Sequence, residues 1–159
     1  MKTILVPIDF SDATDPVVEA GRQLARAIRA RIVLVHVIRP SVLVNEFSAV
    51  VESMAAAVEN NASEQLSHWQ GQLLNEGFTV ETRPLYGQPA ACIRDEAEEL
   101  GADYIVVGSH GHGALYDLVV GSTASALLKE APCPVLVVPV VRRRVTARAA
   151  ALAQAGGAP

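Results

Sequence analysis

Hydrophobic and polar residues alternate along this chain in two kinds of run. Continuous apolar runs rich in valine and isoleucine occur at 3–8, 31–38, 103–107 and 135–141, and a more alternating run occurs at 78–85. Continuous runs of this kind are typical of strands that are covered on both faces. Between the runs, apolar residues recur every three or four positions, which predicts amphipathic helices.

Four segments with helical spacing separate the apolar runs. Ser11 or Asp12 is suited to cap the first helix, and Gly77 is placed to end the long second one. Pro89 falls near the first turn of the third helix, where a missing amide proton is tolerated. Pro84 indicates that the run at 78–85 is an edge strand. The predicted helices extend from the cap to about Ile28, over 47–76, from Pro89 to about Leu100 and over 122–130.

The resulting order of elements alternates strictly between strand and helix, beginning and ending with a strand. Such alternation predicts an α/β fold, a three-layer sandwich in which helices cover both faces of a five-stranded parallel sheet. We expect a flavodoxin- or Rossmann-like sheet with strand order 3-2-1-4-5. In that order the first and fourth strands are neighbours at the point where the order reverses. Ligands bind there, beyond the carboxyl ends of the strands.

Length and composition bound the class of protein. The chain has 159 residues, enough for one domain with a full core, which we assign to 1–141. The two cysteines, Cys92 and Cys133, form no C-x-x-C pair and indicate reduced thiols in a cytoplasmic protein. No apolar run approaches the length of a transmembrane helix and the first residues do not form a signal peptide, so we expect no membrane contact.

Charge is distributed unevenly. The net charge is −4, but residues 142–159 hold four arginines and no acid, which leaves nine basic against seventeen acidic residues in 1–141. An acidic body repels a phosphate backbone, so we expect no nucleic-acid partner. The basic segment 142–159 has no packing pattern and is predicted to be a disordered tail.

The fourth apolar run is followed by the most informative motif of the chain. Gly108, Gly111 and the pair Gly121-Ser122 form the spacing G-x2-G-x9-G-S between this strand and the fourth helix. Glycine lets a ligand approach the backbone, and the first amides of a helix lack internal partners, so the segment is suited to hold phosphate. Neither a Walker loop nor a dinucleotide fingerprint is present. The alternative is that these glycines only form a tight turn.

The glycine spacing resembles the nucleotide-binding signature of the universal stress protein family. Five further segments are similar to that family in the same order, and they cover 4–12, 34–38, 87–93, 102–111 and 131–138. The resemblance extends over about residues 1–140. It implies the adenine nucleotide alpha hydrolase-like version of the fold. It also implies an ATP-binding member of the family, a regulatory protein that acts in stress response.

The resemblance further implies which residues hold an adenine nucleotide, either ATP or else AMP or cyclic AMP. The position matching Asp9 contacts the ribose region or a bound metal ion, Mg²⁺ or Mn²⁺. The alternative is that Asp9 only caps the first helix. The resemblance assigns the base pocket to Pro7, Ile8 and Val37, the base or ribose to Val107 and Gly108, and the phosphates to Gly111, Gly121, Ser122 and Thr123.

The histidines add little chemistry of their own. His110 and His112 lie two positions apart with no third ligand nearby, which favours phosphate or solvent contact over a metal site. We therefore include His110 among the candidate nucleotide-binding residues. His36 lies within an apolar strand run and is interpreted as a hydrogen-bonded core or rim residue rather than a catalytic one.

The sequence also leads to expectations about assembly and catalysis. Under the predicted strand order the run 135–141 is an apolar sheet edge, and the resemblance implies a homodimer formed by pairing of these strands. The alternative is that the basic tail covers the edge. Catalysis needs a water-positioning group and a charge stabiliser, for which only Asp9 with a divalent metal is a starting point. A slow ATPase or phosphotransferase is therefore one alternative function, and a structural dimer that binds no nucleotide is another.

Overall fold

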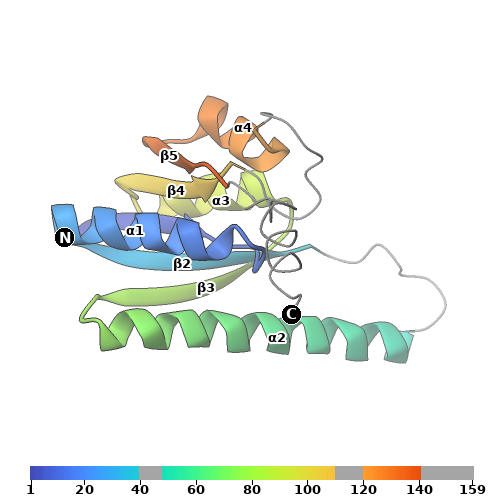
Figure 1. Cartoon of the computed structure of the whole chain (residues 1–159). Coiled ribbons are helices and arrows are strands. Elements are labelled where there is room, and N and C mark those ends of the chain that lie inside the picture. The colour runs from blue at the N-terminus through green and yellow to red at the C-terminus, as the bar shows by residue number, and fades with distance from the viewer. Residues whose placement is uncertain (40–47, 110–119, 141–159) are drawn as a thin grey trace, which may run out of the picture.

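The computed structural model describes residues 1–39, 48–109 and 120–140 (Figure 1). In these residues five strands form one parallel sheet with the order β3-β2-β1-β4-β5. The predicted α/β class and the strand order 3-2-1-4-5 are confirmed. The strands are β1 (Lys2–Pro7), β2 (Ala30–Ile38), β3 (Val80–Tyr86), β4 (Tyr104–Gly108) and β5 (Val135–Val138).

Four helices cover the sheet in the described ranges. They are α1 (Thr14–Ile28), α2 (Ser48–Asn75), α3 (Pro89–Glu99) and α4 (Ser122–Glu130). Apolar residues of α1 and α2 share one core cluster and those of α3 and α4 share the other, so two helices cover each face. No helix in the part of the chain that the structure describes combines the length and the apolarity needed to cross a membrane.

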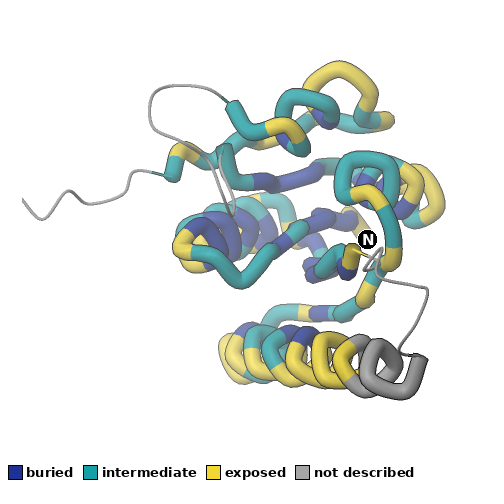
Figure 2. Tube along the Cα trace, turned by 90° about the vertical axis from the view of Figure 1, so that its right-hand side faces the viewer, coloured by how far each residue is buried: buried dark blue, intermediate teal, exposed yellow. Residues whose placement is uncertain are grey.

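The two faces of the sheet receive alternate residues of each strand. On β1, Ile4 and Val6 join the cluster under α1 and α2, whereas Leu5 between them joins the cluster under α3 and α4. All three are fully buried. Figure 2 shows the buried stretches along these central strands. Continuous apolar runs were therefore the correct signal for strands buried on both faces.

Glycines set two features of the helical layer. A Cβ atom built on Gly21 would lie 3.0 Å from Val6 Cγ2, so glycine lets α1 approach β1 closely. Gly77 has φ of 87° and ends α2 as predicted. Its amide donates to the Leu74 carbonyl (2.9 Å) and the Phe78 amide donates to the Leu73 carbonyl (3.1 Å), the bond pair of a Schellman motif.

The start of α1 differs from the prediction. The N-cap is Ala13, which makes no side-chain cap bond, so neither Ser11 nor Asp12 holds that position. Ser11 instead braces the preceding turn, because its Oγ accepts from the Ala13 amide (3.2 Å) and its carbonyl accepts from the Thr14 amide (2.9 Å). The helix α1 therefore begins later than it would with Ser11 or Asp12 as its N-cap.

The last strand is shorter than predicted. β5 ends at Val138 rather than continuing to Val141, and Val141 itself lies outside the described residues. Pro139 has no amide proton to extend the ladder. After it, the Val140 amide donates to Ser109 Oγ (3.1 Å), which ties the chain to the end of β4. Residues 135–138 nevertheless form the expected edge of the sheet.

The amino ends of the strands are joined by a polar network. Asp103 Oδ2 accepts from the Thr3 amide and the Asp103 amide donates to the Thr3 carbonyl, both at 2.8 Å. Arg31 on β2 donates from Nε to Thr3 Oγ1 (2.9 Å) and forms an ion pair with Glu81 on β3. Side chains from four strand starts therefore satisfy one another.

Candidate functional site

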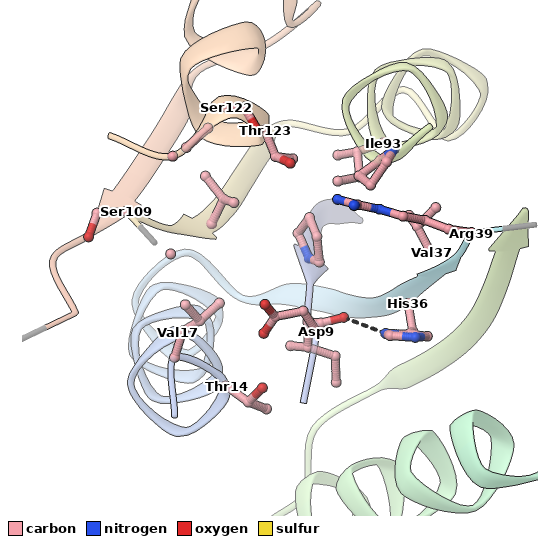
Figure 3. A pocket seen from close by; sticks show the side chains of 18 residues that line it. Asp9, Thr14, Val17, His36, Val37, Arg39, Ile93, Ser109, Ser122 and Thr123 are labelled. Atoms are coloured by element: carbon pink, nitrogen blue, oxygen red, sulfur yellow. Dashed lines mark hydrogen bonds between the residues drawn. The ribbon is translucent and has the colours of Figure 1, made fainter. Parts of the chain in front are cut away.

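A cavity of about 430 Å³ lies beyond the carboxyl ends of β1, β2 and β4, between the first turns of α1, α3 and α4 (Figure 3). Cavities of roughly 300–1,000 Å³ are typical of small-molecule sites. The strand order thus brings together residues far apart in sequence, as predicted. The candidate residues that line the cavity are Pro7, Ile8, Asp9, Val37, Val107, Gly108, Gly121, Ser122 and Thr123.

Two of the candidate residues, His110 and Gly111, lie outside the described residues. The cavity also has walls that sequence reasoning missed. The first turn of α1 contributes Thr14 and Val17, and α3 contributes Ile93. The further lining residues that were not predicted are Ala13, His36, Arg39, Pro89, Ser109 and Ala124.

Asp9 is held by the turn that follows β1. Its Oδ1 accepts from the Ser11 amide (3.1 Å) and from Ser11 Oγ (2.6 Å), which is an Asx-type turn. Phe10 between them has φ of 59°, a left-handed conformation that non-glycine residues rarely adopt. Asp9 therefore fixes the turn that leads from β1 to α1, and it also lines the cavity.

His36 is a hydrogen-bonded rim residue, as interpreted from the sequence. Its Nδ1 lies 2.9 Å from the Ile8 carbonyl (dashed line in Figure 3). A carbonyl only accepts, so Nδ1 carries the proton in this bond. The imidazole stacks on the Phe10 ring with centroids 4.3 Å apart. This stack holds the Ile8–Phe10 segment against β2 and so fixes one wall of the cavity.

The opposite wall is formed by the start of α4. The Gly121 amide donates to the Ser109 carbonyl (2.7 Å), and the Ser109 amide donates to the Val138 carbonyl (2.8 Å). The N-cap of α4 is Gly121, which has no side chain, and Ser122 is the first residue of the helix.

The first turn of α4 presents uncapped amides to the cavity. The first bond of the helix runs from the Ser125 amide to the Gly121 carbonyl (2.9 Å), so the amides of residues 122–124 precede the helical ladder. No side chain of the described residues caps this end, and all three residues line the cavity. An uncapped helix N-terminus carries partial positive charge and attracts anions.

Polar groups inside the cavity are few. Among the described lining residues, Asp9 is the only acid and Arg39 is the only arginine or lysine. Thr14 is 4 % exposed, and its Oγ1 has no hydrogen-bond partner in the described part of the chain. Within the same residues no group of three histidine, cysteine or acidic side chains is placed to hold a metal ion.

Comparisons with known proteins agree with this architecture. The profile of the universal stress protein family matches residues 1–139. The chain is 33 % identical over 140 residues to universal stress protein A homolog 1 of Coxiella burnetii, covering 86 % of this chain and 95 % of that one. It is 29 % identical over 143 residues to universal stress protein YxiE of Bacillus subtilis, covering 85 % and 97 %.

Solved structures show the same fold. Universal stress protein UspA from Lactobacillus plantarum superposes with a TM-score of 0.78 at 27 % identity, covering 86 % of this chain and 97 % of that one. A universal stress protein solved in complex with cAMP superposes with a TM-score of 0.65 at 25 % identity, covering 86 % and 96 %. The family profile spans most of the chain, and the sheet has the strand order expected from the sequence. The chain therefore belongs to the universal stress protein family.

Proposed function

We propose that this chain binds an adenine nucleotide in the cavity at the carboxyl ends of its strands and acts as a regulatory protein in stress response. The nucleotide is ATP, or else AMP or cyclic AMP. The observation that carries the proposal is the uncapped N-terminus of α4, whose first amides face a cavity of nucleotide size. The cAMP complex of a relative with the same fold supports the choice of nucleotide class.

Different walls of the cavity suit the base and the phosphate of such a ligand. Apolar walls at Pro7, Ile8 and Val37 suit a base, and Val107 with Gly108 lies between them and α4. We assign phosphate to the amides and hydroxyl groups of residues 121–123, together with His110 and Gly111, which lie outside the described residues. In this arrangement Asp9, which stands between the two walls, faces the ribose.

A divalent metal fits this site only in company with the nucleotide. Asp9 offers one carboxylate, and one of its oxygens already accepts two hydrogen bonds from Ser11. Mg²⁺ is commonly held by one or two carboxylates together with phosphate oxygens and water. We therefore propose that Mg²⁺ or Mn²⁺ enters with ATP. Metal-dependent phosphate release that Asp9→Ala abolishes, while binding persists, would favour the slow ATPase or phosphotransferase alternative.

The substitution Gly121→Val tests whether the start of α4 holds the phosphate. Gly121 has φ of −57°, which valine adopts without backbone strain, so the substitution adds bulk at the start of α4 without refolding it. We expect ATP affinity to fall by about a hundredfold or more, since the added side chain blocks close approach to the amides.

The matched control is Gly71→Val on α2, where a Cβ meets nothing within 4 Å. Calorimetric titration with ATP measures both variants against the unmodified protein. Equal affinity of all three would remove the start of α4 from the site.

We also propose a homodimer formed by the edge strand β5. Leu136 on this strand is 42 % exposed, and an unpaired apolar edge is suited to pair with a second copy. Leu136→Lys is expected to shift the protein to a monomer in light scattering at micromolar concentration. Leu128→Lys on α4, where the leucine is 53 % exposed, is the control and leaves the dimer intact. A monomeric unmodified protein would contradict the proposal.

A further inference from the structure

Arg39 is the only arginine or lysine among the described residues that line the cavity. It follows Ile38, the last residue of β2, and lies two positions beyond Val37. Successive residues of a strand point to opposite faces, so Arg39 continues the row of Val35 and Val37 on the side of α3 and α4. Figure 3 shows its side chain reaching from the end of β2 across the cavity toward the wall that holds Ile93 and Thr123.

Arg39 also differs from most other arginines in its ionic surroundings. Arg22, Arg31, Arg83 and Arg94 each form ion pairs with carboxylates, and Arg26 lies at the limit of one with Glu76. In the described part of the chain, Arg39 has no such pair. Arg39 is also exposed, so among the described residues nothing closes its guanidinium off from a ligand.

Arg39 shares the cavity with a second positive group, the N-terminus of α4. The N-terminus of α4 carries partial positive charge and faces the same cavity, with no capping side chain among the residues that the structure describes. Two positive groups on facing walls repel each other weakly when nothing lies between them. An anion between them is attracted by both, and a guanidinium binds phosphate oxygens through two parallel N–H bonds.

We propose that Arg39 binds a phosphate group of the nucleotide, which it holds against the first turn of α4. This inference rests on the proposed nucleotide-binding function and adds a phosphate ligand that directly follows β2, on the wall opposite the start of α4. It places the phosphate between two walls of the cavity rather than on one. It also assigns the contact to the phosphate rather than to the base.

The test compares adenosine, AMP and ATP as probes of Arg39→Gln. Adenosine carries the base and ribose without a phosphate, so its affinity is expected to stay within about twofold. AMP and ATP are expected to bind about ten- to a hundredfold more weakly, as a lost charge-assisted hydrogen bond implies. Arg39→Lys keeps the charge without the planar fork and is expected to lose less than Arg39→Gln.

Arg29→Gln is the matched control. Arg29 is exposed, has no ion pair in the described residues, and lies at the other end of β2, roughly 30 Å away. The substitution Arg29→Gln removes the same positive charge as Arg39→Gln, but at a position outside the cavity. Isothermal titration calorimetry of the four proteins at two salt concentrations measures the affinities. The unmodified protein is expected to lose more AMP affinity with salt than Arg39→Gln does.

The outcomes separate the two proposals. A loss for AMP and ATP, or for ATP alone, without a loss for adenosine supports the phosphate contact. An equal loss for adenosine, an equal loss in Arg29→Gln, or no loss at all overturns it while the proposed function stands. If the unmodified protein binds none of the three probes, the proposed function fails, and the role of Arg39 fails with it.

Discussion

The two ends of the parallel sheet satisfy their polar groups in opposite ways. At the amino ends, Thr3, Arg31, Glu81 and Asp103 bond to one another across four strands. At the carboxyl ends, the described residues leave the Thr14 hydroxyl, the Arg39 guanidinium and the first amides of α4 without partners around one cavity. The first end resembles a closed protein surface, and the second resembles a site prepared for a ligand.

This difference has an energetic meaning. A buried polar group without a hydrogen bond costs about 1–3 kcal/mol, so folded chains pair nearly all of them. A buried group that stays unpaired beside the cavity, such as the Thr14 hydroxyl, therefore lowers the stability of the protein alone and gains a partner when a polar ligand enters. Arg39 is exposed and carries no such cost. On this account, substitutions at the amino ends lower stability. Substitutions at the carboxyl ends change binding, and they raise stability where they remove a buried unpaired group.

The largest effect is expected from Asp103→Ala at the closed end. It removes the carboxylate that accepts from the Thr3 amide, and Thr3 is 4 % exposed. We expect the free energy of unfolding to fall by about 1.5–3 kcal/mol, the range for hydrogen bonds to charged groups. Urea denaturation measures the loss. Asp103→Asn keeps an acceptor and is expected to lose less.

Nucleotide affinity of folded Asp103→Ala should equal that of the unmodified protein. Weakened binding by the folded variant would show that the two ends are coupled, which the comparison denies.

The same substitution at two threonines is expected to change the free energy of unfolding in opposite directions. Thr3 and Thr14 are both 4 % exposed, but Thr3 Oγ1 accepts from Arg31 Nε, whereas Thr14 Oγ1 has no partner in the described residues. Thr3→Val is expected to lower the free energy of unfolding by about 1 kcal/mol, and Thr14→Val to raise it by about 1 kcal/mol. Thermal denaturation without nucleotide measures both. The same sign for both variants would contradict the assigned difference.

The smallest effect concerns a thiol near the closed end. Partial burial raises the pKa of Cys133, and the negative charge of Asp103 adds to the increase. Because only the thiolate reacts, Cys133 should be alkylated slowly by iodoacetamide at mildly alkaline pH. Asp103→Asn removes the second cause and should lower the pKa and speed the reaction modestly. Mass spectrometry of the modified cysteine follows the rate, and a slower reaction in the variant would contradict the assigned cause.

The sequence was a good guide to the layers of this fold. Continuous apolar runs predicted the strands, because β1, β2 and β4 are buried on both faces and leave no alternating pattern. Strict alternation with helices then predicted a parallel sheet covered on both faces. The expected doubly wound strand order is confirmed, and it brings Asp9 and Gly121 to one cavity. These conclusions depend on periodicity and connectivity, which a single sequence contains.

The predictions that were wrong concern positions where local hydrogen bonding decides where an element begins or ends. Ser11 is a good capping residue, yet its hydroxyl is engaged with Asp9 and the Ala13 amide, so α1 starts later. The end of β5 is set by Pro139, whose missing amide ends the ladder within a run that is apolar throughout. Arg39 was missed because an arginine after a strand is usually a solvated surface residue. Only the geometry of the cavity distinguishes it.

Amide NMR spectroscopy of the protein titrated with AMP tests the central claim most directly, because it reports on both ends of the sheet at once. The account predicts saturable shifts at the carboxyl end, with Asp9, Val37 and the amides of residues 122–124 among the most affected. Thr3, Arg31 and Asp103 at the amino end are expected to stay unchanged. No shifts at millimolar AMP, or shifts confined to the amino end, would contradict the account.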